Sequence, residues 1–186
     1  MIPALPPLRQ AFLFCILARM TVTNHPHNIE SFHSTILFDR ARIHAAAIYC
    51  SDGRFGEQMD QFLQEALRLP RYDRLAIPGG PACLAGHSAA FRQQQGLLED
   101  LKFLVSVHRL ERVILIGHQN CAFYLDHLHV HEIELLRHQC DDLQKAADRV
   151  REVDPSLEVE SYFAALNGDT VRFRSLETLR DQVAGG

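Results

Sequence analysis

The sequence has no block of like charges and no basic stripe. Its 186 residues include 19 Lys and Arg against 23 Asp and Glu, which gives a formal net charge of −4. A protein that attracts nucleic acid or an anionic membrane surface needs positive charge clustered on one face. The charge pattern therefore predicts that neither nucleic acid nor a membrane is a partner of this protein.

The sequence also lacks an apolar run long enough to span a bilayer, which takes roughly 20 residues. The stretch at 11–17 is apolar, but Arg9 precedes it, Arg19 follows it, and no clear small-residue cleavage site appears. Three interpretations stay open: the start of a signal peptide, a helix that packs on the body or on a partner subunit, or a true start at Met20. We expect residues 1–40 to form an arm that is partly disordered or helical, followed by a single domain at 41–186.

A disulfide framework is absent as well. The five cysteines are an odd number, and their arrangement is unlike that of a small secreted domain. A reducing, cytoplasmic location therefore fits the sequence better, and it would keep thiols available as metal ligands. Cys83 follows a glycine-containing loop and could approach a functional site, although packing explains it more simply. Cys15 and Cys140 are interpreted as buried or incidental.

No internal repeat or low-complexity segment is evident, and we expect no domain boundary after about residue 40. Short apolar runs alternate with longer segments of helical periodicity, which is typical of βαβ units. The sequence predicts an α/β fold with an open, mostly parallel sheet of about four parallel strands and one antiparallel edge strand, flanked by helices. The expected elements are a strand at 43–49, a helix at 55–69, a strand at 72–77, an irregular loop at 78–81, a helix at 88–108, a strand at 113–116, a helix from 121 to about 150, a hairpin at 157–165 and 170–173, and a final helix.

Two short segments carry the chemistry, and each follows an apolar run. They are Cys50-Ser51-Asp52-Gly53-Arg54 and His118-Gln119-Asn120-Cys121. In an open parallel sheet, ligand sites gather beyond the carboxyl ends of the strands, so the two segments are expected to meet. Together they offer two thiolates and one imidazole, a zinc-binding set that leaves one coordination position open. An open position is typical of a catalytic zinc rather than a structural one.

The spacing Cys-x-Asp-x-Arg followed by His-x-x-Cys resembles the signature of the β-class carbonic anhydrases, and the chain is similar to a divergent member from about residue 43 to about residue 173. The resemblance implies that Cys50, His118 and Cys121 bind Zn²⁺, and that Asp52 and Arg54 form a catalytic pair. It implies reversible hydration of carbon dioxide to bicarbonate by a zinc-bound hydroxide that this pair orients. It also implies a homodimer or a higher homo-oligomer.

The chain departs from the family pattern at two places. Ala122 stands where the family usually has glycine, and Pro78-Gly79-Gly80-Pro81 stands where an Arg-Asn-Ala-Gly type of sequence is expected. Two alternatives therefore stay open: a noncatalytic zinc-binding homologue that acts as a sensor or partner module, and a hydrolase of carbon disulfide or carbonyl sulfide. A nucleotide-binding role for Gly79-Gly80 is weak, because no Gly-x-Gly-x-x-Gly follows the first strand.

Histidine is plentiful after the second motif, at His127, His129, His131 and His138. On a helix, His127 and His131 would share a face, which raises the hypothesis of a second metal or of a proton shuttle. Because Asp126, Glu132 and Glu134 surround them, a solvated surface is the simpler interpretation.

Overall fold

The computed structural model describes residues 31–184, and the chain divides into two units between Arg40 and Ala41. Residues 31–40 contain no helix or strand. The predictions about the apolar stretch at 11–17 and about a start at Met20 lie outside the described residues. Within residues 31–184, no helix is long and apolar enough to cross a membrane.

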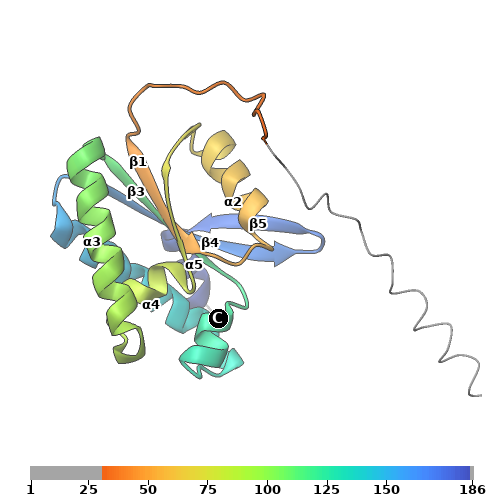
Figure 1. Cartoon of the computed structure of the whole chain (residues 1–186). Coiled ribbons are helices and arrows are strands. Elements are labelled where there is room, and N and C mark those ends of the chain that lie inside the picture. Colours follow the sequence, from red (N-terminus) through yellow and green to blue (C-terminus); the bar gives the residue numbers. More distant parts are fainter. Residues whose placement is uncertain (1–30, 185–186) are drawn as a thin grey trace, which may run out of the picture. The chain divides into compact units, whose positions relative to one another are not determined.

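A five-stranded sheet with the order β2-β1-β3-β4-β5 forms the centre of the second unit (Figure 1). The first four strands in this order run parallel, and β5 pairs antiparallel with β4. The arrangement confirms the predicted α/β class with a mostly parallel sheet and an antiparallel edge strand. The strands are β1 (Ala45–Cys50), β2 (Asp73–Ile77), β3 (Arg112–His118), β4 (Glu158–Asn167) and β5 (Thr170–Ser175).

Helices cover both faces of this sheet. They are α2 (Gly56–Gln61), α3 (Phe91–His108), α4 (Glu132–Val153) and α5 (Leu176–Ala184). Shorter turns complete the fold: the π-helical turns η2 (Phe62–Ala66) and η5 (Phe123–His127), and the 3₁₀ turns η3 (Gly80–Leu84) and η4 (Ser88–Ala90).

Side chains of the central strands alternate between two apolar layers, one on each face of the sheet. Ile48 and Leu115 belong to the layer that α3, α4 and α5 cover. Tyr49 and Ile116 belong to the other layer, which also contains Met59 of α2. Because β1 is buried on both faces, its sequence reads as one continuous apolar run, which is how it was predicted.

The order of the strands places a ligand site at the ends of β1 and β3. From β1 the chain passes to β2 on one side and then returns to β3 on the other, so that the strand order reverses beside β1. The two connections run through α2 and α3, which pack in different apolar layers. In open α/β sheets such a switch point is where ligands bind, beyond the carboxyl ends of the strands. β1 ends at Cys50 and β3 ends at His118.

The segment after Cys121 differs from the prediction of a single helix reaching about residue 150. That prediction is wrong, because η5 ends at His127 and α4 begins only at Glu132. Between them His129 adopts a φ of +55°, in the left-handed region that a right-handed helix excludes. The spacing of apolar residues does not predict such a break, because the residue in the left-handed conformation is not a glycine. The predicted loop at 78–81 likewise differs, since η3 begins inside it at Gly80.

Candidate metal centre

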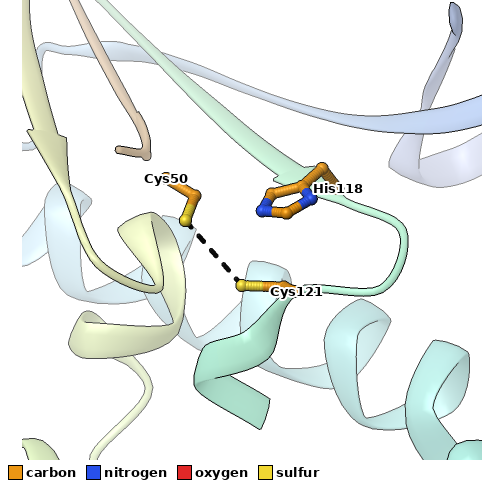
Figure 2. Close-up of side chains that lie close together, drawn as sticks. All are labelled: Cys50, His118 and Cys121. Atoms are coloured by element: carbon orange, nitrogen blue, oxygen red, sulfur yellow. Dashed lines mark hydrogen bonds between the residues drawn. The ribbon is translucent and has the colours of Figure 1, made fainter. Parts of the chain in front are cut away.

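The structure brings the two predicted motifs together at the switch point. Cys50 is the last residue of β1, His118 is the last residue of β3, and Cys121 directly precedes the turn that becomes η5. All three side chains are buried, and their ligand atoms lie within 4.8 Å of one another. Figure 2 shows the two sulfur atoms and the imidazole ring gathered around a common centre. Among the residues described, no other group of three or more His, Cys, Asp or Glu has this arrangement.

The spacing of the two sulfur atoms fits a tetrahedral zinc ion. With Zn–S bonds of about 2.3 Å, two thiolates on a tetrahedral centre are about 3.8 Å apart. The Sγ atoms of Cys50 and Cys121 lie 3.9 Å apart. The pair is therefore already separated as a bound zinc ion requires.

The imidazole of His118 has one nitrogen bonded to the backbone and one free to bind a metal ion. Its Nδ1 lies 2.9 Å from the backbone carbonyl oxygen of Gln119, and as the donor there it leaves a lone pair on Nε2. Nε2 is buried and has no hydrogen-bond partner. A metal-bound histidine almost always donates its other N–H to a carbonyl or carboxylate in this way. Phe55 packs on the ring at a centroid distance of 4.5 Å, which helps to fix its plane.

A hydrogen bond from the Cys121 thiol to the Cys50 sulfur links the two side chains. The hydrogen bond from Cys121 is the main effect that lowers the pKa of Cys50, against the opposing effect of burial, and the backbone N–H of Gly79 acts in the same direction as Cys121. The Gly79 nitrogen lies 3.4 Å from the Cys50 sulfur. The pKa of Cys121 is raised by the same hydrogen bond and by its burial. A bound cation is what would hold both groups as thiolates, because a coordinating thiol loses its proton.

Asp52 and Arg54 form an ion pair next to this cluster. The Arg54 guanidinium donates from Nε to Asp52 Oδ1 at 2.9 Å and from a terminal nitrogen to Oδ2 at 2.5 Å, and the Arg54 backbone N–H adds a bond of 3.1 Å to Oδ1. These hydrogen bonds from Arg54 lower the pKa of Asp52 to about 2. The carboxylate is therefore held ionised and turned to Arg54, and it is not one of the three clustered ligand groups.

An open pocket of about 390 Å³ reaches both Cys50 and Asp52. Its walls include Pro78, Ala122 and Phe123, so the two departures from the family pattern lie at the pocket itself. Gln93 and His127 add polar groups to the same pocket. Gln93 was missed by the sequence analysis, because nothing in the periodicity of α3 indicates that its first turn borders a site formed by distant strand ends.

The structure tests some of the remaining predictions about cysteines and histidines. Cys83 is buried and donates to the Pro78 carbonyl oxygen at 3.2 Å, and burial raises the pKa of this thiol to about 11. Cys140 is also buried, whereas Cys15 lies outside the described residues. The four histidines after Cys121 join no potential metal group in residues 31–184, which leaves the hypothesis of a second metal without support.

Gly80 lets η3 pass close beneath the end of β1. A Cβ atom at this position would lie 2.5 Å from the Tyr49 carbonyl carbon and 2.6 Å from the Cys50 nitrogen, and the residue has a φ of +52°. We expect Gly80→Ala to lower the free energy of unfolding by roughly 2 to 5 kcal/mol, from backbone strain and steric overlap together. Chemical denaturation of the metal-free protein measures this loss.

The matched control for this variant is Gly86→Ala. Gly86 has a φ of +87°, but a Cβ atom there would meet no atom within 4 Å. The Gly86→Ala variant should therefore lose only the stability that the left-handed backbone conformation costs, without the loss from steric overlap. Equal losses in the two variants would show that the close approach to β1 contributes nothing.

A family model described as "Putative carbonic anhydrase" matches residues 41–172. Among solved structures, the β-carbonic anhydrase CafA of the fungal pathogen Aspergillus fumigatus is similar at 17% sequence identity, with a TM-score of 0.38, over 77% of this chain and 83% of that chain. A search of curated proteins found no match.

Proposed function

Because the chain belongs to the carbonic anhydrase family whose model it matches, we propose that it catalyses the zinc-dependent, reversible hydration of carbon dioxide to bicarbonate. One observation carries the proposal beyond the family. The buried Nε2 of His118 has no hydrogen-bond partner, in a cluster where the ligand atoms of Cys50, His118 and Cys121 lie within 4.8 Å of one another. An unpaired buried polar atom is costly, so a bound metal ion would relieve the cost here.

Cys50, His118 and Cys121 would hold the metal. Two thiolates and an imidazole suit zinc, and three protein ligands leave a fourth position for a reactant. When bound, zinc supplies a Lewis acid that makes water a nucleophile at neutral pH. The backbone N–H of Gly79 would support the charge of the Cys50 thiolate throughout the reaction.

Asp52 would orient a reactant in the pocket rather than accept its proton. A group with a pKa of about 2 is a weak base at neutral pH, but an ionised carboxylate is a strong hydrogen-bond acceptor. Arg54 keeps the carboxylate in this state and fixes its plane by two-point contact. Pro78, Ala122 and Phe123 would give the nonpolar carbon dioxide an apolar wall beside Asp52.

Carbon dioxide hydration measured by stopped flow tests the proposal. The protein must first be shown to carry a full complement of zinc, and a Cys50→Ser preparation gives the background. We expect rates far above this background. Full zinc occupancy with background rates would contradict hydration and favour the noncatalytic homologue. Turnover of carbon disulfide or carbonyl sulfide by the same sample would instead identify the alternative hydrolase.

We propose two further properties, one that follows from the family and one that follows from the sequence. One is assembly into a homodimer or higher homo-oligomer, which light scattering of the full chain would measure. The other is a cytoplasmic location, which rests on the cysteine usage in the sequence and stays a prediction.

A further inference from the structure

Two polar side chains of α4 are almost fully buried and have no part in the proposed reaction. Gln139 is 2% exposed and Asp142 is 1% exposed. They lie three residues apart on α4, so they share one side of the helix with the buried Leu135 and Leu143. A buried carboxylate is costly unless it is paired and hydrogen-bonded. Its partners therefore indicate what it does.

Groups from three separate segments lie around the carboxylate of Asp142. His87, in the loop between η3 and η4, places its Nε2 2.5 Å from Oδ2, and Lys145 of α4 places its Nζ 3.3 Å from Oδ1. The hydroxyl of Tyr124 in η5 faces this carboxylate, and the pKa of the phenol is raised by its burial and by the neighbouring charge of Asp142. Tyr124 is 5% exposed, so a buried phenol lies beside the buried carboxylate.

Tyr124 belongs to the turn that carries the metal ligand Cys121. Its backbone N–H donates to the Cys121 carbonyl oxygen at 3.1 Å. The backbone N–H groups of Phe123 and Tyr124 lower the pKa of Cys121, although not enough to offset the opposing effects of Cys50 and burial. Tyr124 is thus tied to Cys121 through the backbone of the turn that they share.

Gln139 makes a corresponding contact with the second metal segment. Its Nε2 donates to the His118 carbonyl oxygen at 2.8 Å. Gln139 and Tyr124 line the same small hollow as His118 and Cys121. One face of α4 therefore holds both sides of the His-x-x-Cys motif.

We propose that Asp142 and Gln139 are positioning residues for the metal centre. Asp142 acts through Tyr124 on Cys121, and Gln139 acts through the backbone on His118. Neither touches a ligand atom. The inference rests on the metal ion of the proposed function, but not on the reaction that the ion supports. Outer contacts of this kind usually contribute 10-fold to 100-fold to metal affinity.

Variants of the Asp142 contact test the proposal. Asp142→Ala removes the carboxylate, and Tyr124→Phe removes only the hydroxyl that faces it. The matched control is Asp73→Ala, which breaks another carboxylate–histidine pair, since His108 Nδ1 lies 2.6 Å from Asp73 Oδ2. Asp73 pairs with Ala46 whereas Cys50 pairs with Ile77, so the control lies four residues along the sheet from the metal ligands, about 13 Å away.

The measurements are affinity for Co²⁺ and Zn²⁺ by competition with a chromophoric chelator, the visible absorption bands of the cobalt-loaded protein, and thermal unfolding of the metal-free protein. We expect Asp142→Ala to lower metal affinity about 10-fold to 100-fold and to shift the cobalt bands. Tyr124→Phe should act in the same direction and more weakly. Asp73→Ala should leave affinity and bands unchanged, even where it lowers the unfolding temperature as much.

The proposal would be overturned if Tyr124→Phe and Asp142→Ala kept wild-type metal affinity and wild-type cobalt bands while their unfolding temperatures fell. The two side chains would then contribute to stability alone. If Asp142→Ala fails to fold, Tyr124→Phe decides by itself. A wild-type protein that binds neither metal would overturn this inference together with the proposed function. A wild-type protein that binds zinc without hydrating carbon dioxide would overturn only the proposed activity.

Discussion

Replacing Cys121 by serine is expected to remove both zinc and carbon dioxide hydration. The variant keeps the fold of η5 but loses one of the two thiolates, and the remaining Cys50 and His118 cannot close a site that needs three protein ligands. Zinc affinity should fall by more than the roughly 100-fold that changes outside the ligand shell produce. Metal analysis after equilibration with a weak chelator and stopped-flow hydration measure the two losses.

Cys140→Ser is the control for this experiment. Cys140 is 3% exposed and lies in α4, so its replacement also places a hydroxyl in the core. It should cost some stability while zinc content and hydration stay at the wild-type level. Retention of full zinc content by Cys121→Ser would contradict the assignment of this residue as a ligand.

The sequence determined the meeting of the two motifs because the rule behind it is topological. Cys50 and His118 follow apolar runs, and parallel strands that surround a switch point bring their carboxyl ends together whatever the helices between them contain. The same few residues were enough to show the family resemblance. The family match over residues 41–172 confirms it. The role of each residue stays a prediction, although the geometry of the cluster supports it.

The surroundings of the site could not be predicted in the same way. His129 breaks the helix after Cys121 with a positive φ, and a histidine is too weak a signal of that conformation to predict the break from the sequence. Gln139 and Asp142 did leave one, because polar residues interrupt the apolar face of α4 close to Leu135 and Leu143. Their partners, however, come from His87, Tyr124 and the His118 carbonyl, which only the folded chain brings near.

The second large effect is expected for Asp52→Asn, which should lower the turnover of carbon dioxide hydration by roughly 100-fold or more while zinc stays bound. The asparagine side chain is uncharged, so Arg54 loses its ionic partner and can no longer fix the group. The amide can also turn its NH₂ toward the pocket and offer a donor where the reactant needs an acceptor. Stopped-flow hydration with parallel zinc analysis separates the loss of turnover from a loss of metal.

Asp148→Asn is the matched control, because Asp148 also pairs with an arginine, at 3.0 Å from Arg151, but on the exposed surface of α4. It should leave turnover unchanged. Arg54→Lys gives a further test of how Asp52 is held, since lysine keeps the charge but cannot make the two-point contact. Turnover between those of the wild type and Asp52→Asn would show that orientation of the carboxylate matters beyond its ionisation. The prediction is contradicted if Asp52→Asn binds zinc and hydrates carbon dioxide as fast as the wild type. The ion pair of Asp52 and Arg54 would then have only a structural role before α2, and another group in the pocket would have to orient the reactant.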